Sequence, residues 1–304
     1  MGRIAFVFSG QGDQYPGMGR ELLFSAGARA VFQRCDSLRS GTLVQCLEGS
    51  EEELKETRNT QPCLFAMEMA AAAALEEAGI RPNVVAGFSL GEMSALTYGG
   101  AMDLDSGFRL VCKRGEVMQQ AAQKQETSMA AVLKLSHQKV EDLCAEFQQM
   151  YPVNFNGAGK ISVAGAAQEM ADFCTAVKQA GGKAIPLKVK GAFHSPFMAQ
   201  AARDFATVLE KEILNKPNLP VYSDVTALPY EGEIKELLAQ QICSPVQWER
   251  IVNHMINEGV DTFVEIGPGK TLCNLIRRMA PSVKVYSVSG DWDAVQKEVP
   301  HAEG

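Results

Sequence analysis

Short apolar runs alternate along the chain with longer segments of helical periodicity. Residues 4–8 (IAFVF) and 83–87 (NVVAG) are continuously apolar, as expected of parallel strands that are covered on both faces. Residues 62–79 are rich in helix formers and end on Gly79, a residue typical of helix C-caps. Further strands are predicted within three later runs, at residues 220–225, 261–267 and 284–288. The alternation predicts an α/β fold with a mainly parallel sheet.

Residues 128–189 follow a pattern of their own. A strand and a helix are followed by two strands around an Asn-Gly turn at residues 156–157, then by a second helix and a last strand. The order β-α-β-β-α-β predicts a small ferredoxin-like unit. Because the sheet pattern resumes afterwards, we interpret this unit as an insertion. Residues 1–127 and 190–304 are then predicted to form one large α/β domain.

Composition and charge limit the classes of function. The 304 residues carry a formal net charge of −7, which argues against bulk binding of nucleic acid. The most apolar segment contains Glu68 in its middle, so no membrane-spanning segment is expected. The eight cysteines show neither Cys-x-x-Cys nor zinc-finger spacing, which predicts reduced thiols in a cytoplasmic protein. No metal or cofactor is expected, and the oligomeric state stays open, with a monomer as the simplest expectation.

A serine lies in the motif GFSLGE, between a predicted strand and a predicted helix. Gly-x-Ser-x-Gly in this context is typical of a nucleophile elbow, in which a sharp turn presents the serine at the end of a sheet. The N-terminal N–H groups of the following helix would then point at the reacting carbonyl group. Ser89 as a simple helix N-cap is the alternative. The strand and helix around the motif favour the nucleophile.

A serine nucleophile needs a base, and the chain has four histidines. His194 lies in a predicted loop between a strand and a helix, where open α/β sheets place their chemistry. A structural or capping histidine is an equally good interpretation of this position alone. The others lie in two helices and in the polar C-terminal segment: His137, His254 and His301.

One arginine lies on the apolar face of a predicted helix. Val111, Arg114 and Met118 share that face at positions i, i+3 and i+7, whereas Lys113 and Glu116 point elsewhere. A buried guanidinium needs an anion. The simplest partner is a carboxylate of the protein itself, in a structural ion pair.

Several spaced motifs together resemble one enzyme family. They are FVFSGQGDQYPGMG, GFSLGE, the arginine 25 residues beyond the serine, AFHSPFM, SPVQW and EIGPGKTL. In this order, over roughly residues 4–275, they are similar to the malonyl-CoA:acyl-carrier-protein transacylases and to the acyltransferase domains of fatty-acid and polyketide synthases. The resemblance implies an α/β-hydrolase-like domain with an inserted ferredoxin-like subdomain. It also implies transfer of a malonyl group from coenzyme A to the phosphopantetheine thiol of acyl carrier protein.

The resemblance also implies roles for single residues. Ser89 would be the nucleophile and His194 the base, oriented by the backbone carbonyl of Gln247 in SPVQW. The backbone N–H groups of Gln11 and Leu90 would form the oxyanion hole. This arrangement would explain why no aspartate stands out as a third catalytic member.

Two further roles concern the substrate. Arg114 would clamp the free carboxylate of the malonyl group, because the planar fork of an arginine suits a carboxylate. Phe193 would exclude methylmalonyl groups by filling the space of an α-methyl group, although a plain core position is the alternative. The sequence departs from the family at Phe88, where a histidine is common, and at Lys160, where a glutamine is common.

Rival functions stay open at this stage. An acyl hydrolase could use the same Ser-His dyad, and a non-catalytic scaffold could bind a carrier domain. A fatty-acid transacylase and a free-standing polyketide acyltransferase also look alike in sequence. An acidic carrier protein would need a local basic patch, for which Lys183, Lys188 and Lys190 are candidates, although a solvated strand end explains them equally well.

Overall fold

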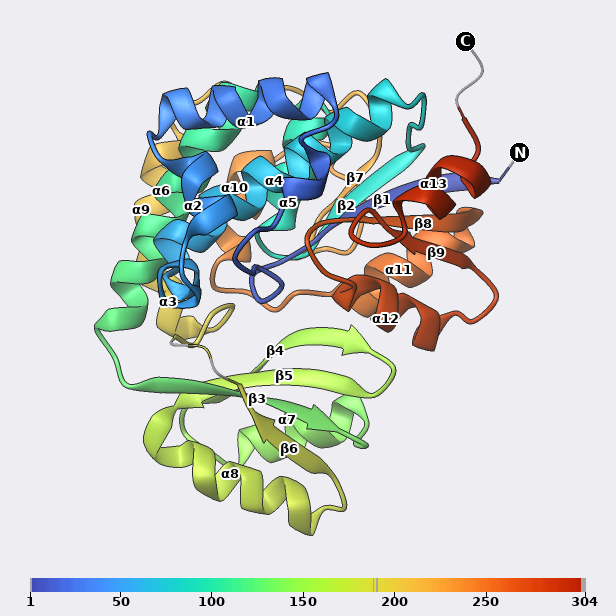
Figure 1. The fold of residues 1–304 in the computed structure, drawn as a ribbon. Coiled ribbons are helices and arrows are strands. Elements are labelled where there is room, and N and C mark those ends of the chain that lie inside the picture. Colours follow the sequence, from blue (N-terminus) through green and yellow to red (C-terminus); the bar gives the residue numbers. More distant parts are fainter. Residues whose placement is uncertain (1, 188, 190, 302–304) are drawn as a thin grey trace.

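Two separate sheets organise the chain. The computed structural model describes residues 2–187, 189 and 191–301 (Figure 1). The larger sheet has five parallel strands in the order β7-β2-β1-β8-β9, so the predicted α/β fold with a mainly parallel sheet is confirmed. Its strands are β1 (Arg3–Phe8), β2 (Val84–Gly87), β7 (Val221–Tyr222), β8 (Val260–Ile266) and β9 (Lys284–Ser287).

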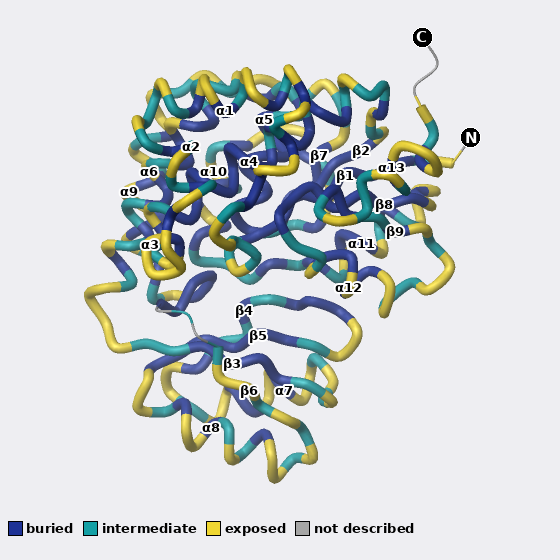
Figure 2. Tube along the Cα trace, in the orientation of Figure 1, coloured by how far each residue is buried: buried dark blue, intermediate teal, exposed yellow. Residues whose placement is uncertain are grey.

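Helices cover both faces of this sheet, which explains its continuously apolar strands. Along β1, Phe6 and Phe8 join one hydrophobic cluster, and Ala5 and Val7 join the cluster on the opposite face. Figure 2 shows the central strands as the most buried part of the molecule. The first face packs mainly against α1 (Ala26–Leu38), α4 (Thr57–Glu77), α5 (Gly91–Tyr98), α6 (Leu104–Gln123), α9 (Ala199–Leu209) and α10 (Ile234–Gln241). The second packs against α11 (Trp248–Asn257) and α12 (Thr271–Met279).

The shorter helical elements lie at the periphery or connect the larger ones. They are η1 (Arg20–Leu22), α2 (Thr42–Glu48), α3 (Glu51–Lys55), η2 (Pro196–Met198) and α13 (Trp292–Glu298).

The smaller sheet is antiparallel, with the strand order β4-β5-β3-β6. Its elements are β3 (Thr127–Leu133), α7 (His137–Ala145), β4 (Met150–Gly157), β5 (Lys160–Ala166), α8 (Ala167–Gln179) and β6 (Lys183–Pro186), so the predicted order β-α-β-β-α-β is confirmed. The hairpin turn differs from the prediction, because β4 continues through Gly157, which pairs with Lys160. Ala158 and Gly159 form the turn, with φ values of 52° and 68°. A two-residue hairpin turn of this kind requires positive φ at both central positions.

Strand β4 joins the smaller sheet to the rest of the molecule (Figure 1). The Phe155 N–H donates to the Val246 carbonyl, and the Val246 N–H donates to the Val153 carbonyl, both at 2.9 Å. His137 Nε2 also lies 2.9 Å from a carboxylate oxygen of Glu249 on α11. The segment that follows α10 therefore pairs with the edge strand β4 through an isolated bridge between Asn154 and Val246.

Helix α4 is the longest helix and runs through the core. Its Glu68 is fully buried and accepts hydrogen bonds from the hydroxyls of Ser9 and Ser94, at 2.8 and 2.6 Å. These bonds offset part of the cost of burying a carboxyl group. No helix among the described residues, α4 included, is long and apolar enough to cross a membrane.

Candidate active site

The sequence GFSLGE forms a sharp turn between β2 and α5, at the carboxyl end of the parallel sheet. Ser89 lies at its tip with a φ of 56°, which is uncommon for a residue with a side chain. A Cβ on Gly87 would lie 1.8 Å from the carbonyl carbon of Gly91, and one on Gly91 would lie 2.3 Å from the carbonyl oxygen of Phe8. Both glycines are therefore sterically required for the turn that holds the serine.

His194 lies in the loop between β6 and η2, as predicted, and its φ is also positive, at 61°. Its Nε2 lies 2.7 Å from Ser89 Oγ, and its Nδ1 lies 2.9 Å from the carbonyl oxygen of Gln241. Because a carbonyl oxygen can only accept, Nδ1 carries the ring proton and Nε2 presents its lone pair to the serine hydroxyl. This is the geometry of a nucleophile with its general base.

The imidazole is held in its neutral form. Burial of His194 lowers its pKa to about 4, and the nearby charge of Arg114 acts in the same direction. The hydrogen bond from Nδ1 to the carbonyl of Gln241 opposes this shift in part. A histidine with this pKa remains unprotonated, and so able to accept a proton from the serine, well below neutral pH.

The prediction that the backbone carbonyl of Gln247 orients His194 is wrong. The backbone N–H of Gln247 donates to the carbonyl of Asp224 at 2.9 Å, and Nδ1 contacts the carbonyl of Gln241 instead. Gln241 ends helix α10, where the last carbonyl groups have no partner inside the helix and are free to accept. The backbone N–H of His194 donates to the next carbonyl, that of Ile242, at 3.1 Å.

Arg114 reaches the same site from α6, on the buried apolar face that was predicted for this helix. Its guanidinium donates to the amide oxygens of Gln61 and Gln241, at 2.9 and 2.7 Å, and Nη2 lies 3.4 Å from Ser89 Oγ. Over the residues that the structure describes, it has no carboxylate within 4.0 Å, so the simple ion-pair interpretation is wrong. Burial lowers its pKa to about 10, which still leaves it charged at neutral pH.

Gln241 contacts all three residues, Ser89, His194 and Arg114, and sequence reasoning missed it. Its backbone carbonyl contacts His194, its amide oxygen accepts from Arg114, and its amide nitrogen donates to the carbonyl of Ser89 at 2.6 Å. Gln61, the other acceptor for Arg114, was also missed. Glutamines in polar or mixed helices carry no periodic signal, so neither position stands out in the sequence.

Two buried carboxyl groups lie behind the nucleophile. Asp224 Oδ2 accepts from the backbone N–H of Ser89 at 2.7 Å, and Glu92 Oε1 accepts from the hydroxyl of Tyr230 at 2.6 Å. The amide nitrogen of Gln241 donates to both carboxyl groups, at 2.6 Å to Glu92 and 3.0 Å to Asp224. Burial raises the pKa of both carboxyl groups, and the proximity of Glu92 raises the pKa of Asp224 further. Asp224 thus holds the turn directly through the Ser89 N–H, and Glu92 does so through the amide of Gln241.

The predicted oxyanion hole is compatible with the local backbone. Leu90 directly precedes the first turn of α5. Gln11 lies in the loop that follows β1. Among the described residues, neither backbone N–H donates to another protein atom. The side chain of Gln11 donates to Thr57 at 3.2 Å, which fixes the loop against α4. The role of both N–H groups stays a prediction.

The structure shows the environment of three further positions that the sequence singled out, but not their roles. Phe193 is buried beside the histidine, and a Cβ on Gly191 would lie 3.1 Å from its ring. Phe88 packs edge-on against Trp248, with ring centroids 5.7 Å apart, in the cluster on the α11–α12 face. Lys160 starts β5 and is partly exposed. Exclusion of larger acyl groups by Phe193 stays a prediction.

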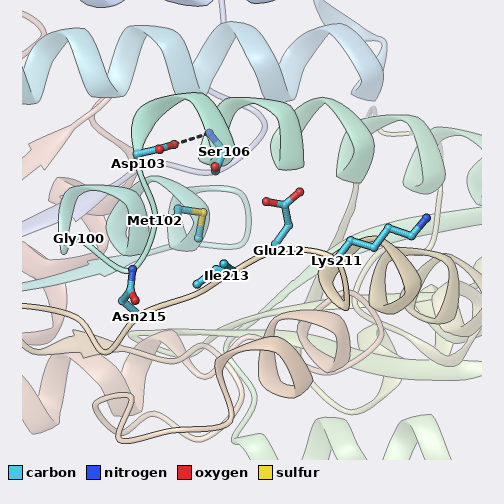
Figure 3. A pocket seen from close by; sticks show the side chains of 8 residues that line it. All are labelled: Gly100, Met102, Asp103, Ser106, Lys211, Glu212, Ile213 and Asn215. Carbon is cyan, nitrogen blue, oxygen red and sulfur yellow. Dashed lines mark hydrogen bonds between the residues drawn. The ribbon is translucent and has the colours of Figure 1, made fainter.

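A cavity of about 640 Å³ lies elsewhere, beside the start of α6 (Figure 3). Figure 3 shows Asp103 turned toward Ser106, whose backbone N–H it caps at 2.7 Å, so this carboxylate is already used. None of the site residues described above lines the cavity. The cavity is therefore separate from the site around Ser89.

Metal ligation and carrier docking were also considered in the sequence. Within the described ranges, no group of three histidine, cysteine or acidic residues could hold a metal ion. Lys183 is exposed on β6, whereas Lys188 and Lys190 lie outside the described residues. The basic docking patch therefore stays a prediction.

Comparison with known proteins gives one consistent result. The family model described as "Acyl transferase domain" matches residues 5–302. The malonyl CoA-acyl carrier protein transacylase of Bacillus subtilis (strain 168) is 38% identical over 298 residues, covering 95% of this chain and 94% of that protein.

Solved structures agree with these sequence matches. The malonyl-CoA:acyl carrier protein transacylase of Xanthomonas oryzae pv. oryzae has a TM-score of 0.94 at 32% identity and covers 99% of both chains. A malonyl-transacylase in complex with a type II polyketide-synthase acyl-carrier protein has a TM-score of 0.90 at 32% identity, covering 94% of this chain and 95% of that one. The likeness thus spans both sheets.

Proposed function

Because the chain belongs to the acyl transferase family, we propose that it transfers a malonyl group from malonyl-CoA to the phosphopantetheine thiol of an acyl carrier protein. One observation carries the proposal. Ser89 Oγ lies 2.7 Å from the unprotonated nitrogen of His194 and 3.4 Å from the guanidinium of Arg114. Nucleophile, base and a buried cation therefore meet at one point, although they lie far apart in the sequence.

The first half-reaction acylates the serine. His194 Nε2 accepts the hydroxyl proton as Ser89 Oγ attacks the thioester carbonyl of malonyl-CoA. The backbone N–H groups of Gln11 and Leu90 would stabilise the oxyanion, and one such donor is typically worth about 3–4 kcal/mol. The carbon–sulfur bond then breaks, and His194 returns the proton to the departing coenzyme A thiol. The product is a malonyl-serine ester.

The second half-reaction reverses these steps with another thiol. His194 takes the proton from the pantetheine thiol of the carrier protein, and the thiolate attacks the ester carbonyl of the malonyl-serine. The carbon–oxygen bond breaks, and the proton returns to Ser89 Oγ. The acyl donor and the acceptor thiol use the site in turn, so ping-pong kinetics are expected.

Arg114 selects a dicarboxylic acyl group. Two of its donors are occupied by amide oxygens of Gln61 and Gln241, which leave its positive charge uncompensated by direct contact. The carboxylate of a malonyl group would supply the missing anion in a bidentate pair. A hydrolase for fatty acyl esters would gain nothing from a buried cation beside its nucleophile, so the transferase is favoured.

A role in polyketide synthesis is the second candidate. One of the structural relatives, at 32% identity, is a malonyl-transacylase bound to a type II polyketide-synthase carrier protein. The same acyl transfer would then supply extender units to a polyketide synthase rather than to fatty-acid synthesis. The two candidates differ in the carrier protein that is accepted, not in the chemistry at Ser89.

Four structural and cellular attributes belong to the same proposal. We interpret residues 1–127 and 190–304 as an α/β-hydrolase-like domain and residues 128–189 as a ferredoxin-like subdomain. The parallel sheet and the strand order β4-β5-β3-β6 support these names. A monomer in the cytoplasm is expected, and the eight free cysteines are compatible with that compartment.

Intact-mass analysis tests the proposed activity. The protein is mixed in turn with malonyl-CoA, methylmalonyl-CoA and acetyl-CoA, and the mass of the chain is measured before and after addition of phosphopantetheinylated carrier protein. A malonyl adduct that moves to the carrier protein is expected. Steady release of free coenzyme A without carrier protein would instead establish a hydrolase, and no adduct under any condition would support a non-catalytic scaffold.

A further inference from the structure

The amide nitrogen of Gln241 is surrounded by more acceptors than it has hydrogens. It lies 2.6 Å from the carbonyl of Ser89, 2.6 Å from Glu92 Oε2 and 3.0 Å from Asp224 Oδ2. The amide cannot be turned over, because its oxygen accepts from Arg114 at 2.7 Å. Two hydrogens thus face three oxygens, two of which belong to carboxyl groups. Two carboxylates that share one donor group do not readily both carry a negative charge, so one of the two is expected to hold a proton.

The two carboxyl groups differ in their other partners. Both oxygens of Glu92 accept hydrogen bonds, from Tyr230 and the Asp224 backbone N–H on one side and from Gln241 on the other. Asp224 receives both of its hydrogen bonds on Oδ2, and its buried Oδ1 has no partner among the described residues. A buried carboxylate oxygen without a donor is costly, whereas a carboxylic acid is much less so. The geometry therefore places a proton on Asp224 rather than on Glu92.

The charge of the cluster depends on that proton. The titratable or charged groups that face Asp224 are Glu92 from α5, Arg114 from α6 and Tyr230 from the loop after β7, with His194 beyond Ser89. With Asp224 neutral, Glu92 and Arg114 leave the cluster without net charge, and the guanidinium of Arg114 contacts amide oxygens rather than Glu92. With Asp224 ionised, the cluster has a net negative charge before any acyl carboxylate arrives, which would oppose a dicarboxylic substrate.

We propose that Asp224 is a protonated positioning residue, which holds the backbone of Ser89 while leaving the positive charge of Arg114 available to the acyl carboxylate. The inference rests on the proposed malonyl transfer for its consequence, but not for the protonation itself. Asp224 touches neither the substrate nor the reacting atoms. It acts through the N–H of Ser89 and through Gln241.

The consequence is an alkaline loss of activity that is specific for the acyl group. Raising the pH ionises Asp224 and adds a negative charge near Arg114, so malonyl transfer should weaken by roughly tenfold relative to acetyl transfer. Acetyl-CoA lacks the second carboxylate and should not sense the change. The acid side of the profile is governed by His194, whose pKa of about 4 lies far from this region.

The test compares Asp224→Asn with the unmodified protein. Single-turnover acylation rates with malonyl-CoA and acetyl-CoA are measured by intact mass across pH 6 to about 10. Asparagine keeps a carbonyl acceptor for Ser89 and cannot ionise, so the malonyl-specific alkaline loss should disappear in this variant. Glu68→Gln is the matched control, because Glu68 is equally buried but, among the described residues, its carboxyl group accepts hydrogen bonds from Ser9 and Ser94 rather than from the Ser89 turn. It should retain the alkaline loss of the unmodified protein.

Two kinetic outcomes would overturn the inference. An alkaline loss of the same size and position in Asp224→Asn would assign it to another group, such as Arg114, whose pKa is about 10. An equal loss with both donors in the unmodified protein would show that the charge does not act on the acyl carboxylate.

A second measurement is independent of catalysis. Carbon-13 spectra of protein labelled at the aspartate carboxyl carbon report whether Asp224 is protonated at pH 7, with Asp224→Asn used only to assign the signal. A protonated signal is expected, and an ionised one would refute the proposal even if the variant folds poorly. If no acyl adduct forms with any donor, the proposed function fails, while this spectrum still decides the protonation of Asp224.

Discussion

The two sides of the site are built in different ways. On the nucleophile side, both glycines and the strained serine that form the turn lie within five residues. Asp224 and Gln241 then add hydrogen bonds to the backbone of Ser89. On the histidine side, His194 takes its position from a distant segment, through the carbonyl groups of Gln241 and Ile242. A local turn is specified by its own sequence, whereas a loop held by another element is specified by the whole fold.

This difference explains how each side tolerates change. The elbow has no redundancy, since a Cβ on either glycine would collide with backbone. The histidine is held mainly by main-chain acceptors, which survive substitution of the side chains that carry them. We therefore expect all-or-none effects on the nucleophile side and graded effects on the histidine side.

The largest effect is expected for Ser89→Ala. Without the hydroxyl there is no nucleophile, so the malonyl adduct should vanish and transfer should fall by at least about a thousandfold. Intact mass after incubation with malonyl-CoA measures the adduct, and circular dichroism confirms that the fold is retained. A malonyl adduct that persists and maps to another residue would refute the assignment of Ser89.

Arg114→Ala is expected to have the next largest effect, and a selective one. Loss of the guanidinium removes the partner of the malonyl carboxylate, so malonyl transfer should fall by about a hundredfold, while acetyl transfer should change much less. The ratio of acylation rates with the two donors is the measurement. Equal losses for both donors would indicate that Arg114 only supports the packing around Gln61 and Gln241.

The extent to which the sequence predicted the site follows the same division. Ser89 could be identified from the sequence because the glycines that the turn requires, and the strand and helix around it, lie within one short stretch. Arg114 could be placed from helical periodicity, because burial of a charged residue on an apolar face is itself a signal. The parallel sheet and the β-α-β-β-α-β order follow from apolar runs and their spacing, which are also local properties.

What the sequence did not reveal depends on contacts between distant elements. The family resemblance predicts Gln247 as the orienting residue, but Nδ1 of His194 contacts the carbonyl of Gln241. The backbone N–H of Gln247 instead donates to Asp224, and its neighbour Val246 pairs with β4. The partnership of Glu92 and Asp224 was equally hidden, since they lie on different elements and meet through the Asp224 backbone N–H and the amide of Gln241. Residue type and spacing do not show which distant side chains come into contact in the fold.

A pair of glutamine substitutions sharpens the comparison of the two sides. Gln241→Ala keeps the carbonyl that holds His194 but removes the amide that contacts Arg114 and Ser89, so malonyl transfer should fall by about tenfold rather than vanish. Gln247→Ala keeps the backbone N–H that donates to Asp224 and should change the rate by less than about threefold. Steady-state rates of transfer to carrier protein provide the measurement. A larger loss in Gln247→Ala than in Gln241→Ala would show that the amide of Gln241 does not support Arg114 and Ser89.

A change in substrate preference, rather than a loss of catalysis, is expected on the histidine side, at Phe193. The residue is buried next to His194 and close to the backbone of Gly191, so a smaller side chain would open space beside the base without removing a catalytic group. Phe193→Ser should therefore relax the preference for malonyl-CoA over methylmalonyl-CoA by a factor of about ten, since one methyl group in a pocket is worth roughly 1–3 kcal/mol. Competition between the two donors in a single intact-mass experiment measures the preference directly. Phe193→Leu is the matched control, because it retains most of the apolar volume and should shift the preference less. An unchanged preference in Phe193→Ser would make Phe193 a core residue, and would leave the selection of the acyl group to Arg114 and the carboxyl groups behind Ser89.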